Sequence, residues 1–149
     1  MLAVAFCDVV ESTAHFAKFG DEEGRRLVQR HLDSLQQALS GSEGRIVDTA
    51  GDGAFISFPH PVTALETLAR LEEIIARDNA KVVRDHYLSV RIGIHWGAVL
   101  TDGVVVTGDA VNLCARVAAS ASPGEIRLTK AAFLELPTLE RLRCEVPRR

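Results

Sequence analysis

The chain has 149 residues, which is enough for one domain with a single buried core, and its formal net charge is −3. Its content of 47% hydrophobic and 25% charged residues is ordinary for a soluble globular protein. The longest runs of consecutive basic residues are two pairs, Arg25 with Arg26 and Arg148 with Arg149. Binding to nucleic acid is therefore not expected.

Three cysteines, Cys7, Cys114 and Cys144, are odd in number and widely spaced. Two lie inside apolar runs, which is typical of reduced, buried thiols rather than of disulfides or a zinc site. No apolar run approaches the ~20 residues of a membrane span, and the start of the chain lacks the features of a signal peptide. We expect a cytoplasmic domain without membrane contact, excised from a longer chain.

Taken in chain order, the hydrophobic pattern alternates between strands and helices. Residues 2–7 are almost wholly apolar, as in a central strand. Ser12 or Thr13 is expected to cap the helix that follows. After a second cap at Asp21, residues 22–39 repeat apolar side chains at helical spacing, which predicts an amphipathic helix lying on the sheet.

A hairpin is predicted next, with strands at 45–50 and 54–58 joined by an AGDG turn whose glycines suit positive φ. Pro61 is placed to open another helix. The remaining elements are expected as strands at 88–95, 104–106 and 125–129 and as helices at 109–119 and 131–136. This order predicts an α+β sandwich with helices packed on a sheet.

Two aspartates interrupt the apolar scaffold, Asp8 at the end of the first strand and Asp52 at the hairpin tip. If these strands are neighbours, both carboxylates meet at one edge, a geometry that holds a pair of divalent cations near a phosphate. The alternative is that Asp8 caps a helix and Asp52 forms a turn. Backbone amides at the start of the next helix would receive phosphate oxygens: those of Val9, Val10, Glu11, Ser12 and Thr13.

Asn112 and Arg116 lie four residues apart, on one face of a helix whose other side chains are small or apolar. Such a stripe indicates contact with something polar; an inter-helix salt bridge is the alternative. His95 and Trp96 are expected to pack at the edge of the core. The histidines without ligand-like spacing are expected to face solvent: His15, His31, His60 and His86.

Five blocks, FCDVVEST, GRIVDTAGDGAFISF, VRIGIHWGAV, GDAVNLCARV and GEIRLT, resemble the class III nucleotide cyclase catalytic domain in order and spacing. The resemblance covers residues 2–136 and implies a single domain over 1–149 with a ferredoxin-like sandwich, in which helices pack on a mainly antiparallel sheet. It also implies an enzyme that converts ATP or GTP into a 3′,5′-cyclic nucleotide and pyrophosphate for intracellular signalling. Catalysis in this family occurs at the interface of a head-to-tail dimer, so we expect a homodimer.

The resemblance assigns roles to the two polar pairs. It implies that Asp8 and Asp52 bind two Mg²⁺ or Mn²⁺ ions and that Asn112 and Arg116 stabilise the transition state. The aspartates of one chain would face Asn112 and Arg116 of the other. The metal would acidify the attacking 3′-hydroxyl, and the arginine would stabilise charge growing on the α-phosphate.

Two base-reading positions depart from the adenylate cyclase pattern: Asp48 stands in place of a lysine, and Val105 in place of an aspartate or threonine. A carboxylate accepts hydrogen bonds, so Asp48 suits the N–H groups of guanine better than N1 of adenine. Val105 offers no hydrogen bond. The pair predicts loose or unusual base choice. The chain also lacks an obvious counterpart of the family's C-terminal hairpin and its triphosphate-binding lysine, which we expect to reflect truncation or weakened phosphate binding.

These departures keep an alternative function open, a catalytically weak or inactive cyclase homology domain that acts as a dimerising or nucleotide-sensing regulatory module. A third possibility is an interaction domain that binds no ligand. The presence of all four residues expected at the active site argues against it, because a drifting module would be expected to lose at least one.

Overall fold

The structure is a computed structural model that describes residues 1–98, 100–101, 106–107 and 109–146. A five-stranded sheet has the order β2-β3-β1-β4-β7, in which neighbours are antiparallel except for the parallel pair β4 and β7. Its strands are β1 (Leu2–Val9), β2 (Arg45–Ala50), β3 (Gly53–Phe58), β4 (Val90–Gly97) and β7 (Ile126–Leu128). The predicted α+β sandwich on a mainly antiparallel sheet is confirmed.

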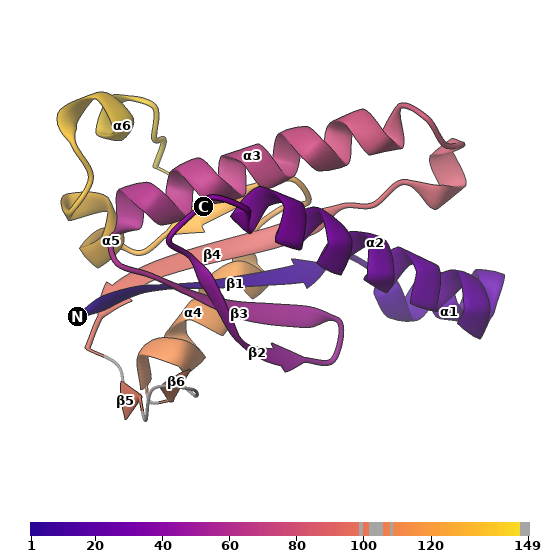
Figure 1. The fold of residues 1–149 in the computed structure, drawn as a ribbon, viewed down its shortest axis with the longest axis horizontal. Coiled ribbons are helices and arrows are strands. Elements are labelled where there is room, and N and C mark those ends of the chain that lie inside the picture. Colours follow the sequence, from indigo (N-terminus) through magenta and orange to yellow (C-terminus); the bar gives the residue numbers. More distant parts are fainter. Residues whose placement is uncertain (99, 102–105, 108, 147–149) are drawn as a thin grey trace.

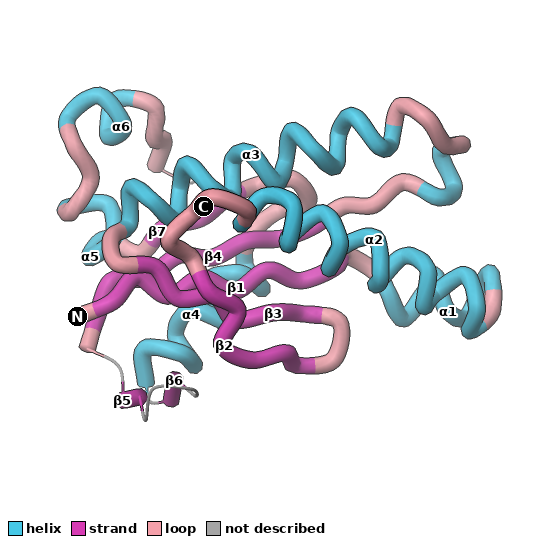
Figure 2. The backbone as a smooth tube through the Cα atoms, in the orientation of Figure 1, coloured by secondary structure: helices cyan, strands magenta, loops and turns pink. Residues whose placement is uncertain are grey.

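Helices cover both faces of this sheet (Figure 1). The long helices α2 and α3 lie across one face and α4 lies across the other, as the backbone tube also shows (Figure 2). The helices are α1 (Ser12–Phe19), α2 (Asp21–Leu39), α3 (Pro61–Asn79), the short 3₁₀ helix η1 (Arg84–His86), α4 (Asp109–Ser120), α5 (Lys130–Leu134) and α6 (Thr138–Leu142). None of the helices in the described ranges is long and apolar enough to cross a membrane.

A small second sheet pairs β5 (Leu100–Thr101) with β6 (Val106–Thr107). Most of the strand predicted at 104–106 lies outside the described residues. The other predicted strands are present with ends shifted by up to two residues. β1 and β4 end two residues later and β3 begins one residue earlier than predicted, because backbone pairing continues beyond the apolar run. β4 also begins two residues later than predicted, and β7 is one residue shorter at each end.

Strand β1 is buried on both faces, which explains its continuous apolar sequence. Ala3, Ala5 and Cys7 belong to the main core beneath α2 and α3, whereas Val4 packs with Cys114 of α4 on the opposite face. The strand runs through Asp8, which pairs with Arg91 of β4. Asp8 is therefore a strand residue, and the alternative that it caps a helix is wrong.

The predicted caps of the first two helices are also wrong. Glu11 precedes α1 in a left-handed conformation with φ of 56°, and no side chain caps this helix. Ser12 and Thr13 instead lie in its first turn. Gly20, with φ of 88°, precedes α2, so Asp21 is an acidic residue of the first turn, where it suits the helix dipole.

The predicted hairpin connects β2 to β3, but its two glycines serve different purposes. Gly51 has the positive φ of 61° that favours glycine. Gly53 is needed for space, because a Cβ there would lie 2.5 Å from Cζ of Phe6. The turn thus fits closely against β1, and Asp52 stands between these two glycines.

Helix α4 approaches the sheet closely at Gly93 of β4. A Cβ at Gly93 would lie 2.5 Å from the Ala118 nitrogen and 2.8 Å from the Cys114 carbonyl oxygen. The Cys114 thiol donates to the carbonyl oxygens of Val4 and Gly93, both at 3.2 Å. Burial raises the pKa of this thiol to about 12. All three cysteines are free, as predicted. The hydrogen bonds of Cys114 connect α4 to both β1 and β4.

We expect Gly93→Ala to lower the free energy of unfolding by about 3 kcal/mol, because the added methyl group meets helix backbone that cannot move without shifting α4. Urea denaturation measures this. Gly41→Ala is the control: its φ of 78° imposes backbone strain, but its Cβ meets nothing within 4 Å. This control should cost about 1 kcal/mol. Equal losses of unfolding free energy in the two variants would show that α4 is not in close contact with β4 at Gly93.

Candidate active site

The fold brings Asp8 and Asp52 together. β1 and β3 are antiparallel neighbours, with Cys7 opposite Ala54, so the end of β1 lies beside the hairpin tip that precedes β3. The two carboxyl groups lie within hydrogen-bonding reach of each other. The expected convergence of these side chains at one edge of the sheet is thus what the structure shows.

The surroundings of Asp8 favour its neutral form. Burial, the hydrogen bond with Asp52 and the negative charge of Asp52 raise the pKa of Asp8 to about 6. The Arg91 guanidinium opposes this shift, with one nitrogen 3.5 Å from an Asp8 oxygen. The Asp8 side chain is 25% exposed, so the pair remains open to a ligand from solution. Two converging carboxylates, one of them hard to ionise alone, are a donor set that suits a divalent cation.

Within the described residues, no group of three or more histidine, cysteine, aspartate or glutamate side chains could hold a metal. Two carboxylates are nevertheless what Mg²⁺ commonly takes from a protein when substrate phosphates supply further oxygens. The residues present therefore fit a cation that binds together with a phosphorylated ligand better than an all-protein metal cage.

One of the five amides predicted to bind phosphate is already hydrogen-bonded within the protein. The Val10 amide donates to the Ser89 carbonyl at 2.8 Å, so it is not available to a phosphate. The first bond of helix α1 runs from the His15 amide to the Glu11 carbonyl. The amides of Ser12 and Thr13 precede that bond, as the donors of an anion site at a helix N-terminus do. Val9 and Glu11 stay predictions.

Asn112 and Arg116 are both exposed on α4 and line one groove of about 730 Å³. The groove is also lined by His95, whereas neither Asp8 nor Asp52 contributes to it. Within the described residues Arg116 forms no ion pair, which removes support for the salt-bridge alternative. The groove that contains Asn112 and Arg116 therefore does not include the aspartate pair.

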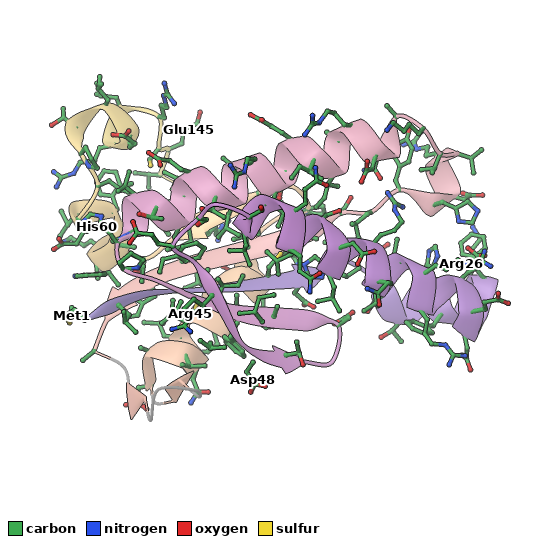
Figure 3. The ribbon with its side chains drawn as sticks, viewed as in Figure 1. Met1, Arg26, Arg45, Asp48, His60 and Glu145 are labelled. Atoms are coloured by element: carbon green, nitrogen blue, oxygen red, sulfur yellow. The ribbon has the colours of Figure 1, made fainter. Side chains whose placement is uncertain are left out.

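Asp48 lies on β2, the edge strand of the sheet, and points away from helices α2 and α3 (Figure 3). It is exposed, and one of its oxygens accepts a hydrogen bond from the Thr49 amide at 2.8 Å. The β2 register shifts between Ile46 and Asp48, which marks a bulge at this point. The second predicted base-reading residue, Val105, lies outside the described residues.

Sequence-based prediction missed His31. It was expected to face solvent, but it is fully buried between α2 and the sheet. Its Nε2 lies 3.1 Å from the Cys7 sulfur and its Nδ1 lies 3.2 Å from the Asp52 carbonyl oxygen. Burial lowers the pKa of His31, so the neutral ring is favoured. Its spacing of four residues from both Leu27 and Leu35, which are buried on α2, was the available signal.

His95 combines the expected packing role with a place in the groove. Its Nδ1 lies 2.8 Å from the Thr129 hydroxyl, which also accepts a hydrogen bond from the Ala132 amide at the start of α5. Burial lowers the pKa of His95. The other residue next to the site, Arg91, could have been found from strand register, because its alignment opposite Asp8 fixes their contact.

Residues 1–146 match the family model described as the adenylate and guanylate cyclase catalytic domain. The chain therefore belongs to this family. It is 29% identical over 103 residues to putative adenylate cyclase 3 of Rhizobium meliloti, with 69% of this chain and 18% of that protein aligned. An adenylate cyclase of Streptomyces coelicolor is 31% identical over 134 residues, covering 90% of this chain and 33% of the relative. The chain thus spans a third or less of these relatives' length.

The fold is also similar to a solved structure of an adenylate cyclase from Trypanosoma brucei in its monomeric state. The TM-score is 0.77 at 22% identity, and the match covers 97% of this chain and 79% of the other. This likeness confirms the class III cyclase fold.

In metal-free Asp52→Asn protein, we expect the pKa of Asp8 to fall, because the charge of Asp52 helps to raise it. In the wild type, ionisation of Asp8 opposes folding, so this residue's contribution to stability is lost as the pH rises from 3.8 to about 6. The variant should lose less stability over that interval. A ¹³C NMR titration of the Asp8 carboxyl and urea denaturation at both ends of the interval measure these effects.

The control for this experiment is Asp48→Asn, which removes the same charge from an exposed position on the same hairpin. It should leave the Asp8 titration unchanged. An Asp8 pKa that is the same in Asp52→Asn and in the wild type would contradict the proposed contact between the carboxyls.

Proposed function

We propose that this chain supplies half of each active site in a class III nucleotide cyclase. The enzyme converts a nucleoside triphosphate, ATP or GTP, into a 3′,5′-cyclic nucleotide and pyrophosphate. The observation that carries the proposal is the convergence of Asp8 and Asp52 at one edge of the sheet, while Asn112 and Arg116 line a groove that neither aspartate enters. Family membership and the adenylate cyclase names of the relatives support the same reaction.

In the reaction, the substrate's 3′-oxygen forms a bond to the α-phosphorus and the bond to the β-phosphate oxygen breaks. Pyrophosphate leaves with the electron pair, and the hydroxyl proton passes to solvent. Asp8 and Asp52 would hold two Mg²⁺ or Mn²⁺ ions, which would supply Lewis-acid stabilisation at the hydroxyl and the phosphates. Arg116 donates to the α-phosphate as its charge grows, Asn112 orients the ribose, and the Ser12 and Thr13 amides receive phosphate oxygens.

Two observations support a head-to-tail homodimer. First, the groove lined by Asn112 and Arg116 includes neither Asp8 nor Asp52, and a second copy placed head-to-tail would bring the two pairs to one triphosphate. Second, the sheet face that carries α4 has a cluster of partly exposed apolar side chains beside the aspartates: Phe6, Val47, Phe55 and Val111. A second chain placed over this face would cover them and bring its own α4 to the aspartates.

The identity of the base depends on Asp48. Its exposed carboxylate offers acceptors at the sheet edge, which match N–H donors of guanine and oppose the N1 acceptor of adenine. We expect base choice to be loose or to favour GTP. The adenylate cyclase names of the relatives do not decide this point, because the chain spans only part of each.

The alternative is a weak or inactive cyclase homology domain that dimerises or senses nucleotides. The acidic residue at position 48 favours it, and the retention of both polar pairs opposes it. Under either function a cytoplasmic location is expected, because the three free cysteines suit a reducing compartment.

Purified protein with Mn²⁺ and each of ATP, GTP, CTP and UTP should form a cyclic product from at least one of them. Asp52→Ala and Arg116→Ala should each lose about 10³-fold or more in rate, because each removes one side of the site. An equal mixture of the two variants should recover about a quarter of wild-type activity, since half of the dimers would be mixed and each would hold one intact site. Product chromatography measures all three.

This mixing experiment separates the alternatives. Each variant alone forms dimers in which both sites are damaged, so it serves as the control for the mixture. Activity that does not recover on mixing would contradict shared sites. No cyclic product from any of the four nucleotides, with nucleotide binding unchanged by Asp52→Ala, would refute the enzymatic function.

Replacing Asp48 with lysine should shift the ATP-to-GTP ratio of kcat/KM toward ATP by about 10- to 100-fold, the range of one hydrogen bond that is gained with one base and lost with the other. Glu43→Lys is the matched control, because it makes the same charge change at an exposed site just before β2. An unchanged ratio in Asp48→Lys would refute the base-reading role of this position.

A further inference from the structure

His31 connects the two segments that carry the aspartates. Its ring lies fully buried on the inner side of α2, with one nitrogen 3.1 Å from the sulfur of Cys7, which directly precedes Asp8. The other nitrogen lies 3.2 Å from the main-chain oxygen of Asp52 itself. A single side chain from a third element thus contacts both β1 and the hairpin tip.

The hydrogen-bonding partners define the tautomer of this ring. The Asp52 carbonyl oxygen can only accept, so Nδ1 of His31 carries the proton and donates it. Nε2 is then an acceptor, and the buried Cys7 thiol is its donor. The chain of bonds runs from Cys7 S–H to Nε2 and from Nδ1–H to the Asp52 carbonyl, which satisfies both ring nitrogens.

We propose that His31 is a positioning residue that fixes the main chain of Asp52, and hence its carboxylate, against Asp8. The inference rests on the proposed function only in taking these carboxylates to hold the metal. Backbone pairing of β2 with β3 reaches the turn at Ala50 and Gly53, and Gly51 has no side chain that could hold the tip, so the His31 bond adds a side-chain contact to the residue between the two glycines. The His31 bond thereby acts at the one residue of the turn whose side chain binds the cation.

Packing alone does not account for a histidine here. A leucine would fill a similar buried volume without the cost of removing two polar nitrogens from water. The histidine is instead matched at both nitrogens by groups flanking the two aspartates. Groups that hydrogen-bond a metal-ligating side chain commonly change metal affinity by about 10- to 100-fold when they are removed. His31 acts on the main chain of Asp52, so we expect an effect near the lower end of that range.

Two substitutions separate the two ring nitrogens. In His31→Asn, the side-chain amide nitrogen lies near the position of Nδ1 and retains a donor for the Asp52 carbonyl. In His31→Gln, the amide lies near the position of Nε2, keeps a partner for Cys7 and leaves the carbonyl unpaired. Each replacement side chain leaves part of the buried space of the histidine ring unfilled, so both variants should lose thermal stability.

Mn²⁺ binding to the full chain, measured by electron paramagnetic resonance, provides the first readout. We expect His31→Gln to weaken binding about tenfold or more and His31→Asn to remain within about threefold of the wild type. Hydrogen exchange of the amides at 54–56 should accelerate in His31→Gln and much less in His31→Asn. Equal losses in the two variants, in binding and in exchange, would show a purely structural role and overturn the proposal.

A measurement that needs neither metal nor activity completes the test. ¹⁵N NMR of the imidazole in the wild-type protein should show His31 with its proton on Nδ1, the tautomer that is the minor form of free histidine. A proton on Nε2 would overturn the proposal whatever the enzyme does. If the wild type binds no Mn²⁺ and forms no cyclic product, the proposed function fails, and the tautomer together with the exchange rates at 54–56 still decides whether His31 holds the hairpin tip.

Discussion

The pairing of β1 with β3 on one side and β4 on the other is the constraint on which the site depends. β1 bears small residues, Ala3 and Ala5, that are wholly buried under α2 and α3, so its register cannot slip without exposing one face of the core. That register delivers Asp8 to the hairpin tip on the β3 side and to Arg91 on the β4 side. The first strand is thus both the centre of the fold and one edge of the site.

The opposite layer positions the other polar pair by the same means. Cys114 and Ala118 are one helical turn apart and are buried against β4, where Gly93 permits close contact. Asn112 and Arg116 precede them by two residues each, which is about 200° around a helix, and therefore point away from the sheet. The buried residues of α4 therefore fix the orientation of the exposed ones, and Asn112 and Arg116 are held on a rigid surface.

Much of this could be predicted from the sequence, because hydrophobic spacing records which faces are buried. The apolar run at 2–7 and the helical stripe at 22–39 gave the correct elements, and strand adjacency predicted that Asp8 and Asp52 meet. Contacts between distant segments left no such pattern. The Val10 amide is occupied by Ser89, almost eighty residues away, and His31 has a polar identity at a position whose spacing is that of a core residue.

The geometry of the aspartate pair shows how a fold maintains an arrangement of two carboxyl groups that is unfavourable in itself. Two carboxylates in contact repel when both are ionised, and Arg91 relieves this only in part, because the pKa of Asp8 stays raised to about 6 although one Arg91 nitrogen lies 3.5 Å from an Asp8 oxygen. The chain holds the pair from outside instead: β1 fixes Asp8 through backbone pairing, and His31 fixes Asp52 through its carbonyl. Neither the backbone pairing of β1 nor the His31 hydrogen bond uses a carboxylate oxygen, so these two interactions leave both carboxylates available to bind a cation.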